Sequence, residues 1–126
     1  MGAVHGFASV IGGKTSAPHG EICGALLPAV LACHAQKAEQ NTEIFRRLDW
    51  VFSQINQNFA AQSPYLGLEE LRNWSRAQGL RGLNAMGLQT QDYVNIATAA
   101  AQASSMRATP FPLTQADRLQ MLNAAG

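Results

Sequence analysis

Apolar residues recur at helical spacing along most of this chain, and no segment alternates apolar and polar residues long enough to predict a strand. The clearest stripe runs from Ile44 to Ile55, with Arg46, Arg47 and Asp49 on the opposite, solvated side. We therefore predict an all-α chain of five or six helices. Its 126 residues suffice for one domain that buries about two-thirds of its unfolded surface.

Turn formers and prolines divide the helical pattern into segments. Gly12 and Gly13 end a short first helix, Pro18 opens the second, and Gly79 stops a later one. Loops or connectors are expected at residues 14–17, 56–66, 80–88 and 109–112. The predicted helices cover residues 1–11, 18–40, 42–55 and 91–104, with one more that contains Leu68, Leu71 and Trp74 and a last one that contains Leu119, Met121 and Leu122.

Polar residues at three of these starts are candidate N-caps. Asn41 precedes the apolar stripe, and Thr90 precedes an alanine-rich helix against which another helix could pack closely. Thr114 with Asp117 resembles a capping box, with Asp in place of the usual Glu or Gln. Pro28 lies inside the second helix and cannot donate a backbone hydrogen bond, so we expect a kink there.

Composition narrows the possible partners. Charged residues make up only 13% of the chain and the net charge is +1, so nothing indicates nucleic acid or an acidic membrane as a partner. So few charges favour a buried interface, in a homo-oligomer or against another domain, and Trp50 and Trp74 are expected as core or interface anchors. No signal peptide and no apolar span is recognisable, so we expect a cytoplasmic protein.

The cysteines and histidines are the candidates for disulfide formation or metal binding. Cys23 and Cys33 lie about 15 Å apart along one predicted helix, too far for a disulfide. His5 and His19 each stand beside a glycine, and a histidine pair suggests metal binding. A tight site needs a third ligand that the sequence does not make obvious, so a structural role for His19 at a helix start stays open. His34 belongs near a helix C-terminus, where the dipole favours its charged form.

The sequence around the two histidines resembles the C-terminal, metal-binding half of the iron-containing (group III) alcohol dehydrogenases. That family adopts the helical fold of the dehydroquinate synthase-like type. The similarity covers nearly the whole chain in the family's order. The residues that carry it are Val4-His5-Gly6, Ile11-Gly12-Gly13, Pro18-His19-Gly20, Cys23-Gly24-Ala25-Leu26-Leu27-Pro28, Ala103-Ser104-Ser105-Met106-Arg107-Ala108, Pro110 and Leu113-Thr114.

The resemblance implies that His5 and His19 are ligands of a divalent metal, iron or zinc. Several members of the family carry a further active-site histidine four positions after the first ligand, where this chain has Ser9. Proton transfer by that route is therefore in doubt, and no catalytic residue is assigned. Cys23 lies one helical turn after His19 and either faces the same cavity or packs.

The family's N-terminal nucleotide-binding domain, with an aspartate and a histidine that complete the metal site, is absent from residues 1–126. No glycine-rich phosphate loop follows a strand, so NAD(P) is implied only if such a domain is supplied. We expect one helical domain, inactive as an isolated dehydrogenase half. Its partner would be a separate nucleotide-binding domain or a second copy. The alternative is a free-standing dimerisation or interaction module derived from a truncated dehydrogenase, in which two histidines from each chain could form a four-ligand site.

Overall fold

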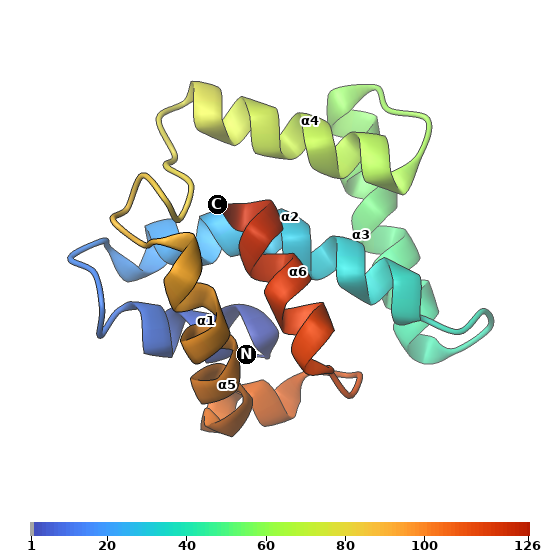
Figure 1. The fold of residues 1–126 in the computed structure, drawn as a ribbon. Helices are drawn as coiled ribbons and strands as arrows, with labels where there is room; N and C mark the ends of the chain where they lie inside the picture. Colours follow the sequence, from blue (N-terminus) through green and yellow to red (C-terminus); the bar gives the residue numbers. More distant parts are fainter. Residues whose placement is uncertain (1) are drawn as a thin grey trace.

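The computed structural model describes residues 2–126, and Met1, expected at the start of the first helix, lies outside this range. No β-strand occurs among the described residues, and the prediction of an all-α fold is confirmed. Two 3-10 turns, η1 and η2, lie on either side of α5 (Figure 1). The elements in chain order are α1 (Ala3–Ile11), α2 (His19–Lys37), α3 (Glu43–Phe59), α4 (Pro64–Ala77), η1 (Thr90–Asp92), α5 (Tyr93–Gln102), η2 (Ser104–Ala108) and α6 (Gln115–Ala125).

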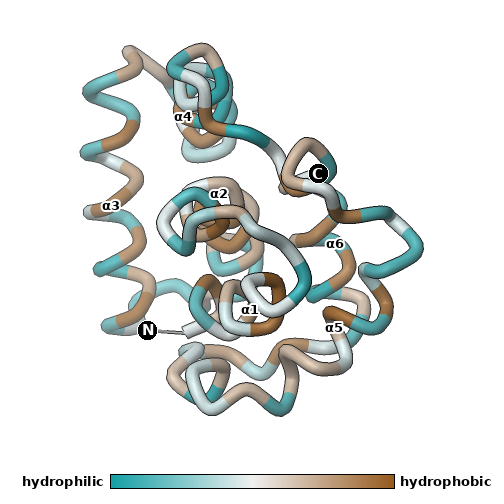
Figure 2. The backbone as a smooth tube through the Cα atoms, turned by 90° about the vertical axis from the view of Figure 1, so that its left-hand side faces the viewer, coloured by the Kyte–Doolittle hydropathy of each residue, from teal (hydrophilic) through white to brown (hydrophobic). Residues whose placement is uncertain are grey.

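Helix α2 is the centre of the arrangement and contacts α1, α3, α4 and α6. Helices α3 and α4 pack against each other and lie on one side of α2, whereas α1, α5 and α6 lie on the other (Figure 2). Helix α1 is held between α2, α5 and η2. None of the described helices is long and apolar enough to cross a membrane.

The main core lies between α1, α2, α5, α6 and the connector at residues 80–88. Helices α3 and α4 contribute little to it: Phe52 is the one buried residue of the apolar stripe on α3, and Leu68 is the buried apolar side chain of α4. The α3–α4 pair is therefore an outer layer on a core built by other elements. The largest side chains shielded from solvent in the core are Phe7, Ile11, Ile22, Leu26, Leu83, Tyr93, Ile96, Met121 and Leu122.

Two of the predicted boundaries around α3 differ from the structure. The expected N-cap at Asn41 is wrong, because Asn41 adopts a left-handed conformation with φ of 67° and Thr42 caps the helix instead. The Thr42 hydroxyl accepts a hydrogen bond from the Phe45 N–H at 3.1 Å. The loop expected at residues 56–66 is also shorter, since α3 continues to Phe59 and α4 begins at Pro64. Gln57 and Asn58 are exposed on the solvent face of this outer helix, whereas Asn56 faces Gly67 of α4, so these polar residues are compatible with a helix.

The segments after α4 follow the prediction more closely. Gly79, with φ of 96°, follows the end of α4, and residues 80–88 form an irregular connector. The expected cap at Thr90 is wrong, because Thr90 begins η1 and α5 starts only at Tyr93. The capping box of α6 is confirmed: the Thr114 hydroxyl accepts from the Asp117 N–H at 3.1 Å, and the Asp117 carboxylate accepts from the Thr114 N–H at 2.7 Å.

Candidate metal centre

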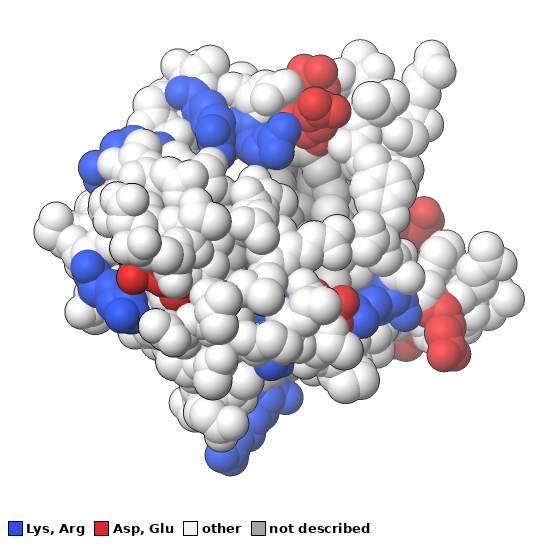
Figure 3. Space-filling model, viewed as in Figure 1, with Lys and Arg blue, Asp and Glu red and all other residues white. Residues whose placement is uncertain are grey.

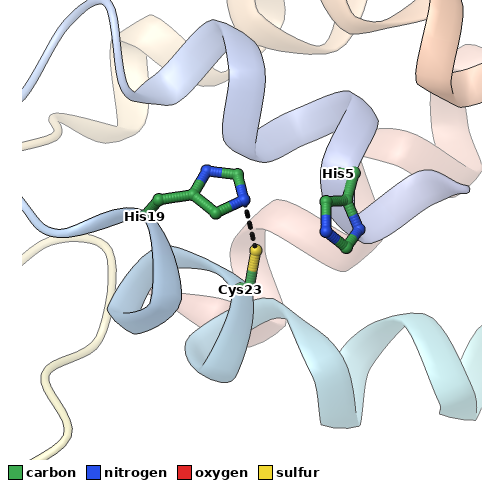
Figure 4. A group of neighbouring side chains, drawn as sticks. All are labelled: His5, His19 and Cys23. Atoms are coloured by element: carbon green, nitrogen blue, oxygen red, sulfur yellow. Dashed lines mark hydrogen bonds between the residues drawn. The ribbon is translucent and has the colours of Figure 1, made fainter. Parts of the chain in front are cut away.

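The candidate site is formed where α1 and α2 face each other at the end of the domain that carries the loop between them. His5 lies on the first turn of α1, and His19 is the first residue of α2. Cys23 follows His19 by four residues, which places both side chains on one face of α2. Figure 4 shows all three side chains directed into the space between the two helices.

The distances within this group are short. The imidazole rings of His5 and His19 have centroids 5.5 Å apart, with an angle of 48° between their planes. Cys23 Sγ lies 3.4 Å from His19 Nε2, within hydrogen-bonding distance. One ligand atom from each of the three residues can be chosen so that all lie within 4.8 Å of one another. Among residues 2–126, this is the group of histidine, cysteine and carboxylate side chains arranged to hold a metal ion.

Buried neighbours of the three residues fix the two helices. Phe7 and Ile11 of α1 are completely buried on the side of the helix away from His5, and Ile22 of α2 is completely buried one residue before Cys23, so both helices are anchored in the core close to the site. Gly6 lets α1 approach η2 closely, because a Cβ at this position would lie 3.3 Å from the Met106 Cα and 2.8 Å from its Cε. The backbone that carries His5 is thus positioned by direct contact with the C-terminal part of the chain.

The Cys23 thiol is the side chain beside the two histidines that offers a further ligand atom, because the nearby carboxylate is engaged elsewhere. Partial burial raises the pKa of the Cys23 thiol. Glu21 is near in sequence, but its carboxylate accepts hydrogen bonds from Arg81 at 2.8 and 2.7 Å. The bond from Arg81 is the main cause that lowers the pKa of Glu21. His19 is exposed, and His5 and Cys23 are half-buried, so the group is open to solvent or to another domain on one side.

Two other residues discussed from the sequence lie outside this group. Ser9 is exposed one turn after His5, and its hydroxyl donates to the Gly6 carbonyl at 3.0 Å within α1. His34 is in the last turn of α2 as predicted, but the expectation that its charged form is favoured is wrong, because burial lowers its pKa. Its ring packs against Phe111 with centroids 5.5 Å apart.

The tryptophans are not core residues. Trp50 is 65% exposed and Trp74 is 54% exposed, both on the outer α3–α4 layer, so only the interface alternative remains as a prediction for them. Arg46 and Arg47 lie on the solvated face of α3, as expected, and both pair with Glu43 at 2.9 Å.

A helical domain that presents two imidazoles from facing helices is of a kind that metal-dependent enzymes use. The chain belongs to the Fe-containing alcohol dehydrogenase family, because the model of the C-terminal part of that family matches residues 1–126. This match covers the whole chain and confirms the resemblance seen in the sequence. The family's metal is a divalent cation, usually iron.

Solved structures confirm the fold. An alcohol dehydrogenase from Oenococcus oeni superimposes with a TM-score of 0.72 at 19% identity, and a 1,3-propanediol oxidoreductase superimposes with a TM-score of 0.72 at 20% identity. In each case the match covers 100% of this chain and 33% of the other, so the chain spans about a third of the length of these enzymes. No curated protein matches the sequence.

Proposed function

We propose that this chain is the metal-binding helical half of an iron-containing alcohol dehydrogenase-like oxidoreductase, with His5 and His19 as two ligands of the metal. The observation that carries the proposal is the approach of the two imidazoles, with centroids 5.5 Å apart, from facing helices that the core holds in place. Two histidines fourteen positions apart meet only because α1 and α2 pack side by side.

The residues present fit a divalent metal. Neutral imidazole nitrogens suit both iron and zinc, and the open side of the group leaves room for further ligands. A bound metal would supply Lewis-acid polarisation of a substrate oxygen. The role of this chain would be to hold and orient the two imidazoles, and the packing of α1 against α2 fixes their positions.

The rest of the active site is proposed to come from a nucleotide-binding domain, on the same or a separate chain. The chain spans about a third of the enzymes it resembles in fold, and residues 2–126 contain no strand on which a phosphate loop could be built. We therefore expect no NAD(P)-dependent activity from residues 1–126 alone. The two free cysteines of this chain support a location in a reducing compartment such as the cytoplasm.

Metal content tests the proposal. Fe²⁺ or Zn²⁺ is titrated anaerobically into the metal-free chain, and the bound metal is measured at equilibrium with the free metal. We expect the wild type to bind about one ion per chain, weakly, because the two imidazoles are only part of the ligand set. Both His5→Ala and His19→Ala should lose it. Ser9→Ala is the matched control on α1, because its side chain bonds only to its own helix and the variant should retain the metal. A wild-type chain without metal would refute the proposal.

An interaction module is the alternative function, and the outer layer favours it. Among residues 2–126, six large apolar side chains are exposed, and four of them lie on α3 and α4: Trp50, Tyr65, Leu66 and Trp74. Figure 3 shows charged side chains over α4 as well as uncharged areas between the charged groups of this face. A homodimer through α3 and α4 would cover these apolar side chains. If the histidines bridged two copies instead, chelation would dissociate the dimer, so an unchanged mass after chelation would exclude the four-histidine arrangement.

A further inference from the structure

We propose that a cavity between α2, α4 and α6 binds a free α-amino acid with an apolar side chain, whose carboxylate is held by Arg72 and whose ammonium group is held by Glu69. The cavity has a volume of about 260 Å³ and lies on the α4 side of α2, whereas the two histidines lie where α2 faces α1. It shares no residue with the candidate metal group, so its occupation does not depend on the proposed function.

Small side chains keep this cavity open. Helices α2 and α6 line one side of it with alanines and a proline, and α4 lines the other side. Because these side chains are short, α4 packs along α2 without filling the space between them. The volume is slightly below the about 300–1,000 Å³ of pockets that take drug-sized ligands, so a smaller molecule fits. The short residues are Ala25, Pro28, Ala29, Ala32 and Ala124.

The cavity is also lined by an ion pair that is not closed. The nearest charged atoms of Arg72 and Glu69 are 4.0 Å apart, and in the part of the chain that the structure describes neither side chain makes a hydrogen bond. The other four salt bridges among residues 2–126 measure 2.7 or 2.9 Å. Arg76, one turn further along α4, donates to the backbone oxygen of Gly126 at 2.6 Å. Arg72 and Glu69 therefore keep donors and acceptors available to a ligand.

The separation within the pair matches the two charged groups of an amino acid. Standard bond lengths place the ammonium nitrogen of an α-amino acid about 2.7 Å from the nearer carboxylate oxygen. Charge-assisted hydrogen bonds are about 2.8 Å long. If the ammonium faces Glu69 and the carboxylate faces Arg72, the four atoms form a trapezoid with two sides of about 2.8 Å, and its long side is the observed 4.0 Å. The ligand thus bridges both groups without moving them apart.

The remaining surface of the cavity selects an apolar side chain. Apart from Arg72 and Glu69, the described residues that line it are uncharged, and Leu68 among them is buried. Tyr65 also lines the cavity and is 50% exposed, so its ring can cover a bound side chain. Each methylene group removed from water strengthens binding about fourfold. A zwitterion without a side chain, such as glycine, gains nothing from this surface.

Nuclear magnetic resonance of the ¹⁵N-labelled, metal-free 126-residue chain tests the site, with L-leucine as the probe. Leucine should shift amide signals of α2 and α4 on either side of the cavity. Arg72→Gln and Glu69→Gln each remove one charge, and Ala29→Leu fills the cavity from α2. Glu70→Gln is the matched control, because Glu70 is the exposed neighbour of Glu69 and does not line the cavity. Circular dichroism confirms that each variant is folded.

The three cavity variants should bind leucine about tenfold or more weakly, whereas Glu70→Gln should bind it as the wild type does. Glycine should bind about tenfold or more weakly than leucine. So should 4-methylpentanoate, which lacks the ammonium group, and 3-methylbutylamine, which lacks the carboxylate. If 4-methylpentanoate binds as tightly as leucine and Glu69→Gln has no effect, the amino-acid assignment is wrong and the cavity takes a monocarboxylate. A folded wild type without leucine-dependent shifts in α2 and α4 would overturn the site altogether and leave the metal proposal unaffected.

Discussion

Removing the Asp117 carboxylate should destabilise the domain in a pH-dependent way. Asp117 completes the capping box of α6 and also pairs with Lys37 of α2, whose Nζ lies 2.9 Å from Oδ2. The same oxygen accepts from the Thr114 N–H at 2.7 Å. These contacts stabilise the start of α6, the helix that carries the buried core residues Met121 and Leu122.

The size of the effect follows from these contacts. Loss of a side-chain cap costs about 1 kcal/mol, and loss of a carboxylate from the first turn of a helix costs about 0.3–1 kcal/mol more. For 126 residues, the entropy of unfolding makes about 1 kcal/mol equivalent to about 4 °C in Tm. We therefore expect Asp117→Ala to lower Tm by about 5–8 °C at neutral pH. Asp117→Asn should have a smaller effect, because the amide can still accept from Thr114.

The pH dependence has a definite sign. Burial acts to raise the pKa of Asp117, but hydrogen bonds from Lys37 and Thr114 outweigh it and hold the pKa below its ordinary value. A depressed pKa stabilises the folded state fully above the ordinary pKa of about 3.9, and this contribution disappears as the pH falls through the folded-state pKa. The difference in Tm between wild type and Asp117→Asn should thus be constant from neutral pH down to about 5 and shrink below about 4.

Thermal unfolding followed by circular dichroism measures these differences. Gln120→Ala is the matched control, an exposed position on the same helix where we expect a change within about 0.5 kcal/mol. Equal Tm values for wild type and Asp117→Ala at neutral pH would refute the capping argument. A difference between wild type and Asp117→Asn that stays the same in strong acid would refute the electrostatic part.

Two further substitutions probe the core and the outer layer. Phe7→Ala empties a completely buried position on α1 and should cost about 3–5 kcal/mol in urea denaturation, and a loss under about 1 kcal/mol would contradict the packing described for α1. Trp50→Ala removes a side chain that is 65% exposed, so stability should change by less than about 0.5 kcal/mol. If the chain dimerises through α3 and α4, sedimentation should show the same variant shifted to monomer, and an unchanged mass would exclude Trp50 from the interface.

Much of the fold could be predicted from local patterns. The apolar residues between Ile44 and Ile55 predict a helix because their spacing places them on one face. The Thr114–Asp117 pair predicts a helix start because the two residues of a capping box are only three positions apart. Asn41 failed as a cap because two adjacent polar residues compete for the position, and its left-handed conformation passes the role to Thr42. The sequence cannot show which of two neighbours takes that conformation.

The site was predictable only in part. The spacing of His19 and Cys23 indicates a shared helix face, but whether that face meets His5 depends on how α1 packs on α2. His34 likewise packs against Phe111, a residue far along the chain, and its burial in the folded domain reverses the expectation from the helix dipole. The candidate residues can thus be named from the local sequence, whereas their convergence is a property of the packed domain.

The contact between Gly6 and Met106 has a consequence for how the protein is made. Helix α1 is synthesised before the other helices described here, yet two of its packing partners, α5 and η2, come about 90 to 100 residues later in the sequence. A ribosome that adds about 5–20 residues per second needs on the order of 5–20 s to supply them. During this time Phe7 and Ile11 lack part of the packing that buries them in the folded domain, so the segment that bears His5 reaches its final position only after synthesis passes residue 106.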